Sequence, residues 1–295
     1  MKLYAPSYYK NFRCIADKCK NNCCIGWEID VDNDTIEKYR RLKNDYSPFI
    51  LDSISMEDTP HFKLCEGERC PHLDERGLCK IIINCGDAYL CDICREHPRF
   101  YNYTTVAEVG IGMSCEEASR VILSSSEYKV LEEIGEIDAE PDNIDFDGRM
   151  VRSEIYEILS DASLCYGKRL EKIYSKYQVN VGDDEKWLKL LSSLEYIDIN
   201  HKNLFLNYSS KLRPLEKALE EYLERFLAYL IYRHCTEAVD NADFCVRLSF
   251  CLFLERLLSS LIYTGRVNSL TDVISLATII SSEIEYSEDN TFTLM

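Results

Sequence analysis

Four cysteines lie within eleven residues of one another early in the chain. They are Cys14, Cys19, Cys23 and Cys24, in the stretch FRCIADKCKNNCC. Thiols this close in sequence make poor core filler in any regular element, whereas thiolates are the preferred ligands of zinc and of iron–sulfur clusters. The stretch therefore predicts a soft-metal centre.

A second, sparser set of cysteines follows. Each lies beside a predicted turn, strand end or helix start, where a ligand can be fixed without straining a regular ladder: Cys70, Cys79, Cys94 and Cys115. Ser114 and Glu117 match a capping box, which places Cys115 at the first helical position, where the helix dipole favours a thiolate. We expect these four to complete the metal-binding set.

The role of the other cysteines before residue 116 stays open. Cys65, Cys85 and Cys91 are alternative ligands or plain packing residues. His72 and His97 stand beside Cys70 and Cys94, and we expect them to support ligands rather than to bind metal themselves. Four cysteines in the predicted helices, Cys165, Cys235, Cys245 and Cys251, are expected to pack as small hydrophobes.

The spacing of the cysteines distinguishes only weakly between zinc and an iron–sulfur cluster. Four-cysteine zinc sites usually contain two Cys-x-x-Cys pairs, and Cys91 with Cys94 forms the only such pair, so an iron–sulfur cluster is favoured and zinc is the alternative. Disulfides are a third interpretation. The start MKLYAPSYYKNFRC lacks the apolar run of a signal peptide, however, so we expect a cytoplasmic protein whose thiols stay reduced.

Charge is distributed unevenly along the chain. Residues 1–115 hold 15 Lys and Arg against 18 Asp and Glu, a net −3, so the remaining residues carry −14 of the total −17. An acidic surface repels phosphate backbones, which argues against nucleic acid as a partner. It suits a lysine-bearing protein substrate, or it serves only solubility. The longest uninterrupted apolar run, Phe226 to Tyr232, is too short to cross a membrane.

The predicted fold is mainly α. We expect a cysteine-rich, metal-stapled region at 1–115 with short β hairpins, and a bundle-like helical region at 116–295 packed with it as one unit. In the first region, Gly26–Asp32 alternates as a strand, Asp74–Gly77 reads as a hairpin turn, Gly86–Ile93 as a short helix and Tyr101–Met113 as an extended hairpin.

Beyond Cys115 the apolar spacing is helical almost throughout, with no intervening strand. Asp183 or Asp184 is expected to cap one helix, and Pro214 to open a long one. Phe244–Tyr263 is apolar on more than one face and is therefore expected to be central. The series closes with Thr271–Tyr286.

Several enzyme classes lack their motifs. The chain has no Gly-x-Gly-x-x-Gly after a strand, no Walker loop and no His-Glu-x-x-His. Val109-Gly-Ile-Gly-Met is the nearest approach to a glycine loop, but it lacks a βαβ frame. Nothing in the residues singles out a methyl-donor site or a catalytic side chain.

The ordered cysteine segments resemble a known family. FRCIADKCKNNCCIGWEIDVD, RCPHLDERGLCKI, CDICREHPRF and MSCEEASRVIL, followed by IYRHC and SSEIEYSEDN, are similar to the flagellin lysine-N-methylase family, within the wider zinc- or iron-chelating cysteine-cluster proteins. Two departures are Ser282 and Tyr286, where the family pattern leads us to expect Arg and His.

The resemblance implies a protein-lysine N-methyltransferase. It would transfer methyl groups from S-adenosylmethionine to lysines of flagellin and carry a 4Fe–4S cluster. By position, the implied ligands are Cys14, Cys19, Cys23, Cys24, Cys70, Cys79, Cys94 and Cys115. The alternative is a non-enzymatic zinc- or iron-chelating protein. The cluster could bind the methyl donor or only hold the fold together.

Overall fold

A computed structural model describes residues 1–141, 145–182, 184–210 and 215–295. The chain forms two compact units. The small unit comprises residues 13–99, and the large unit comprises residues 1–12 together with 100–295. This partition differs from the predicted regions 1–115 and 116–295, since the first twelve residues and the 100–115 hairpin segment belong to the helical unit.

A mixed four-stranded sheet explains this difference. Its strand order is β4 (Arg99–Tyr103), β5 (Ala107–Ile111), β1 (Lys2–Pro6) and β6 (Leu131–Glu136). β1 runs parallel to β5, with Leu3 opposite Ala107, and antiparallel to β6. The hairpin predicted at 101–113 is confirmed as β4 and β5. The expectation of helices without an intervening strand was wrong, because β6 follows the first helix of the large unit.

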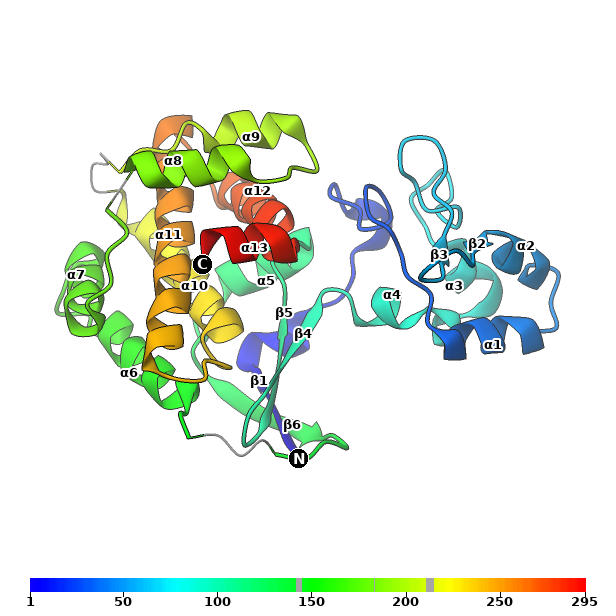
Figure 1. Cartoon of the computed structure of the whole chain (residues 1–295), viewed down its shortest axis with the longest axis horizontal. Coiled ribbons are helices and arrows are strands. Elements are labelled where there is room, and N and C mark those ends of the chain that lie inside the picture. The colour runs from blue at the N-terminus through cyan, green and yellow to red at the C-terminus, as the bar shows by residue number, and fades with distance from the viewer. Residues whose placement is uncertain (142–144, 183, 211–214) are drawn as a thin grey trace. The chain divides into compact units, whose positions relative to one another are not determined.

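Helices make up most of the large unit, which confirms a mainly α fold (Figure 1). α10 packs along α11, and α11 is buried on most of its circumference, as its all-round apolar pattern predicted. The helical segments are α5 (Glu116–Ser124), α6 (Gly148–Ser160), α7 (Tyr166–Tyr177), α8 (Asp184–Ser193), α9 (Ile199–Phe205), α10 (Lys217–His234), α11 (Asn241–Gly265), α12 (Leu270–Ile280), a π-helical turn (Ser281–Glu285) and α13 (Glu288–Leu294).

No helix in the described residues combines the length and the apolar character that a membrane crossing requires. Asp183 and Pro214, predicted at helix starts, lie outside the described residues; in the structure α8 starts at Asp184 and α10 at Lys217.

The small unit consists of short elements around a small core. They are α1 (Asn33–Arg41), α2 (Ser47–Asp52), β2 (Ile54–Ser55), β3 (His61–Phe62), α3 (Lys80–Cys85) and α4 (Asp92–Glu96). The strand predicted at Gly26–Asp32 does not form in full: Gly26 and Trp27 lie in a bend, and Asp30 makes an isolated antiparallel bridge to His61. Ile29 and Val31 are buried as predicted, and their backbones pair with Phe62 and Pro60. The antiparallel β2–β3 pair lies in a stretch for which the sequence predicted no strand.

Two local predictions were wrong. The helix predicted at Gly86–Ile93 is a 3-10 turn at Asp87–Tyr89, after which α4 begins at Asp92. The N-cap of α5 is Cys115, and the buried hydroxyl of Ser114 has no hydrogen-bond partner among the described residues. The expected capping box does not form, because Glu117 pairs with Arg120 on its own helix instead.

A buried ion pair joins the sheet of the large unit to its helices. Arg152 of α6 donates two hydrogen bonds of 2.7 Å to Glu108 of β5 and one of 2.6 Å to the hydroxyl of Thr236 after α10. Both charged side chains are at most 3% exposed. A buried pair adds little net stability over an apolar pair, but breaking it leaves an unpaired charge in the core.

We predict that Arg152→Met lowers the free energy of unfolding by about 3–5 kcal/mol, because Glu108 is left buried without its cation. Urea titration followed by circular dichroism measures this. Lys168→Met is the matched control, since it breaks the exposed Lys168–Glu171 pair and should leave the midpoint unchanged. Equal midpoints for the two variants would contradict the role given to the buried pair.

The glycines of Val109-Gly-Ile-Gly-Met allow close packing rather than phosphate binding. A Cβ on Gly110 would lie 2.3 Å from the ring of Phe100. A Cβ on Gly112 would lie 2.2 Å from the hydroxyl of Tyr286 and 2.7 Å from Nη1 of Arg233. The backbone of β5 therefore approaches these side chains at a distance that only glycine permits.

We predict that Gly110→Ala destabilises the protein by about 1–3 kcal/mol, the usual cost of overpacking, because the Phe100 ring must move. Gly167→Ala in α7 is the control: its Cβ would meet nothing within 4 Å, and alanine should stabilise the helix by up to about 1 kcal/mol. Thermal unfolding compares the two, and a harmless Gly110→Ala would refute the close-approach explanation.

Candidate metal centre

Six thiols gather in or beside the core of the small unit: five belong to its core cluster, and Cys23 is exposed beside them. Cys70 and Cys91 are among its buried residues, and Cys24, Cys79 and Cys94 pack against them. Cys23 joins the group through a hydrogen bond between its thiol and that of Cys24. Segments far apart in sequence therefore bring sulfur atoms together, among them five of the eight predicted ligands: Cys23, Cys24, Cys70, Cys79 and Cys94. Their role as metal ligands stays a prediction.

Backbone pairing brings these segments together. The amide of Cys70 donates to the carbonyl of Cys24 at 2.8 Å. The turn at Asp74, whose carboxylate accepts from the amides of Arg76 and Leu78 at 2.8 Å, folds the chain back so that Cys79 pairs with Leu73. Gly77 takes a φ of +79° in this turn, which favours glycine. The predicted hairpin turn is thus confirmed.

Helix starts hold the remaining thiols. Cys79 is the N-cap of α3, Cys91 is the N-cap of α4, and Cys94 lies within the first turns of α4. Backbone amides bond to three of the thiols: those of Ile81 and Ile82 to Cys79, that of His72 to Cys70 and that of Cys94 to Cys91. Amides that point at sulfur stabilise the thiolate form, which is the form that binds metal.

The thiols of the group shift one another's pKa values through hydrogen bonds and charge. The hydrogen bond from Cys24 lowers the pKa of Cys23 to about 7, and the same bond raises the pKa of Cys24. Cys91 and Cys94 repeat this arrangement: their mutual hydrogen bond lowers the pKa of Cys91 and raises that of Cys94. Burial raises the pKa of Cys70 to about 11, and charges on Cys79 and Cys91 add to the effect.

These shifts have a common physical cause. Several thiolates in one partly buried group repel each other, so all six cannot ionise together without a positive charge among them. A metal ion or cluster supplies such a charge and deprotonates the thiols that bind it.

His72 is not available as a ligand. Its Nδ1 lies 2.9 Å from the hydroxyl of Tyr46, and its Nε2 lies 2.9 Å from that of Ser53. Ser53 already donates its proton to the carbonyl of Ile50, so Nε2 of His72 donates and Nδ1 accepts. Burial lowers the pKa of His72 to about 4, which keeps the ring neutral. It supports the region around Cys70 by packing against aromatic rings, including that of Phe62.

The other candidate cysteines lie in different surroundings. Cys14 is exposed, and the half-buried Cys19 bonds to the carbonyl of Asn21 at 3.3 Å. Cys115 is half-buried in the large unit at the start of α5. Their role as ligands stays a prediction.

Cys91 is the member of the thiol group that the sequence left open. Cys65 is exposed within electrostatic range of Cys70, and Cys85 accepts a hydrogen bond of 3.3 Å from Asn44. The Cys91-x-x-Cys94 spacing was the sequence signal that could have identified Cys91 as a candidate ligand, because pairs of metal ligands commonly have this spacing.

The donor set fits a soft metal by its chemistry. The group offers several sulfur donors, backbone amides point at three of the thiols, and the neighbouring His72 is bonded elsewhere. In the described part of the chain, no three His, Cys, Asp or Glu side chains stand ready arranged around one ion. The thiols are therefore gathered but not preset to a single coordination geometry.

A second polar cluster joins the segments IYRHC and SSEIEYSEDN in the large unit. The buried Glu285 carboxylate, in the π-helical turn, accepts from Nε2 of His234 at 2.8 Å and from the hydroxyl of Tyr229 at 3.0 Å. The guanidinium of Arg233 lies 3.5 Å from the same carboxylate and 4.7 Å from the ring centre of Tyr286. Tyr286, where a histidine was expected, thus packs as an aromatic partner of Arg233.

Comparison with known proteins supports the predicted resemblance. The chain is 27% identical over 136 residues to a lysine-N-methylase of Salmonella typhimurium (strain LT2) and to one of Salmonella choleraesuis. It is 29% identical over 136 residues to the flagellar biosynthetic protein FliU of Salmonella muenchen. The resemblance to the flagellin lysine-N-methylase family is confirmed.

The similarity is partial. Each match covers 43% of this chain, and it covers 34% of the two lysine-N-methylases and 80% of FliU. The matched segment thus spans about a third of the length of the first two relatives. No family model matches the chain, and no solved structure matches it.

We predict that Cys91→Ser lowers the metal bound per chain after oxygen-free purification, because serine replaces a sulfur at the centre of the thiol group. Elemental analysis for iron and zinc measures this. Cys165→Ser, at an exposed cysteine of the large unit, is the control and should bind as much metal as the unsubstituted chain. Equal metal content in both variants would remove Cys91 from the site.

Proposed function

We propose that this chain is a protein-lysine N-methyltransferase that transfers methyl groups from S-adenosylmethionine to lysines of flagellin. The observation that carries the proposal is the similarity to proteins named lysine-N-methylase, in a chain whose N-terminal cysteines gather into one thiol group. Since the match covers part of each protein, the activity of the whole relative is carried over here as a proposal.

We further propose that the thiol group binds a 4Fe–4S cluster, with zinc as the alternative. The residues that would hold it are drawn from Cys23, Cys24, Cys70, Cys79, Cys91 and Cys94, and Cys14, Cys19 and Cys115 remain candidates. When bound, the cluster supplies the positive charge that lets neighbouring thiolates coexist. The six gathered thiols are more than the four that such a cluster needs. Cysteine could therefore bind every iron of the cluster, which supports a structural role for it.

The small unit supports this structural role. Six of the twenty residues in or against its core are cysteines, namely Cys24, Cys70, Cys79, Cys85, Cys91 and Cys94. In many other proteins a small domain rich in cysteine folds only with its metal bound. We therefore infer that metal binding and folding of residues 13–99 are coupled.

Transfer of methyl groups from labelled S-adenosylmethionine tests the enzymatic proposal. The protein, purified without oxygen and with its metal content measured, is incubated with flagellin, and label on lysine is read by peptide mass spectrometry. We expect mono- or further methylated lysines, and reduced labelling with Cys91→Ser. A fully metal-loaded protein that leaves flagellin lysines unlabelled would instead favour a non-enzymatic metal-chelating protein.

A further inference from the structure

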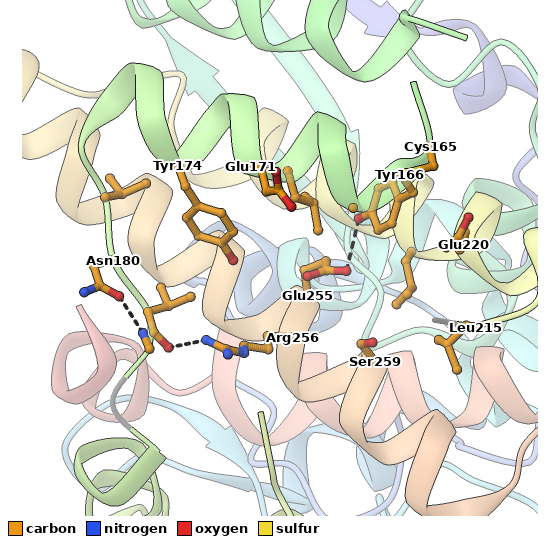
Figure 2. A pocket seen from close by; sticks show the side chains of 16 residues that line it. Cys165, Tyr166, Glu171, Tyr174, Asn180, Leu215, Glu220, Glu255, Arg256 and Ser259 are labelled. Carbon is orange, nitrogen blue, oxygen red and sulfur yellow. Dashed lines mark hydrogen bonds between the residues drawn. The ribbon is translucent and has the colours of Figure 1, made fainter. Parts of the chain in front are cut away.

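The large unit contains a cavity that neither the sequence motifs nor the thiol group accounts for. It has a volume of about 600 Å³ and is open to solvent on one side (Figure 2). It is formed by α7, the segment 179–182, the start of α10 and the middle of α11. A cavity of this size is in the range of small-ligand sites.

A buried carboxylate lies at its centre. Glu255 of α11 is only 3% exposed, and the hydroxyl of Tyr166 donates to its Oε1 at 3.1 Å. Figure 2 shows Tyr166 and Tyr174 extending from α7 toward Glu255. Within the described residues no Lys, Arg or His forms an ion pair with this carboxylate. The neighbouring Arg256 instead donates to the carbonyl of Val181 at 2.6 Å.

A carboxylate buried at this depth without an ion pair is costly, so a cation bound in the cavity would stabilise it. Burial raises the pKa of Glu255 to about 7, while the hydrogen bond from Tyr166 and the charge of Arg256 act in the opposite direction. Of the described residues that line the cavity, Glu171 and Glu220 add carboxylates and Arg256 adds a cation. The charge of the cavity therefore favours a cationic occupant over an anionic one.

The rest of the lining suits an aliphatic stem. Leu170, Leu223, Val179 and Val181 contribute apolar surface, and the tyrosine rings offer faces that attract cations. The apolar wall leads to a buried carboxylate. This arrangement is complementary to a lysine side chain, in which four methylene groups end in an ammonium. A nucleotide-like anion would instead meet carboxylates of the same charge here.

We propose that this cavity binds the side chain of the acceptor lysine, with Glu255 as the catalytic residue that receives its proton. This inference rests on the proposed methyltransferase function. The Glu255 carboxylate takes a proton from the ammonium and becomes a carboxylic acid. The nitrogen lone pair then forms a bond to the methyl carbon of S-adenosylmethionine, while the C–S bond breaks and its electron pair leaves with S-adenosylhomocysteine.

Tyr166 is a positioning residue in this scheme. Its hydroxyl donates to one carboxylate oxygen of Glu255, which orients the other toward the cavity and keeps the ionised form accessible. A base that titrates near neutral pH is well matched to removing a proton from a bound amine, and general-base catalysis of this kind contributes roughly 10²–10⁴-fold.

Binding is tested first, by calorimetry on the whole metal-loaded protein. The probe is a short flagellin-derived peptide with one lysine, and the control peptide carries norleucine in its place, which keeps the stem and removes the cation. We expect the lysine peptide to bind at least about tenfold more tightly and the preference to disappear in Glu255→Gln. Equal affinities for the two peptides in the unsubstituted protein would overturn the inference, whatever the variant does.

Methyl transfer is tested next. We expect Glu255→Gln to lower kcat at least about 100-fold with circular dichroism unchanged and Tyr166→Phe to lower it less. Glu185→Gln, at an exposed position of α8, should retain it. An active protein whose Glu255→Gln variant keeps its rate within twofold would overturn the role of Glu255. If the unsubstituted protein fails to methylate, the proposed function fails, while the peptide preference still decides whether the cavity binds lysine.

Discussion

The structure depends most on the mutual repulsion of several thiols that are gathered in or beside the core of the small unit. Pairs such as Cys23 with Cys24 and Cys91 with Cys94 lie in direct contact, so ionising one member raises the cost of ionising the other. The proposed metal centre would resolve this repulsion and would add cross-links between short elements such as α3 and α4.

The large unit is stabilised differently. α11 is buried over most of its length, and several buried charged groups of this unit are paired, as Arg152 is with Glu108 and Glu285 with His234. Glu255 differs from these, because its carboxylate has a tyrosine partner but forms no ion pair among the described residues. The two units thus have different cores: that of the small unit is rich in cysteine, and that of the large unit is mostly aliphatic and aromatic and lies beside the cavity around Glu255.

Sequence patterns predicted what depends on nearby residues. The turn at Asp74, the hairpin before Met113 and the central helix near Phe244 follow from local turn chemistry and periodicity. β1 and β6 were missed because their pairing joins residues more than a hundred positions apart. The membership of Cys91 and the cavity around Glu255 likewise depend on how distant elements pack, which no spacing encodes.

X-ray absorption at the iron and zinc edges, on the whole chain purified without oxygen, tests the central claim most directly. The account predicts a stoichiometric metal whose nearest neighbours are sulfur at about 2.3 Å, with short iron–iron distances if the centre is a cluster. A protein that folds without stoichiometric metal, or a metal whose nearest neighbours are nitrogen and oxygen, would contradict it.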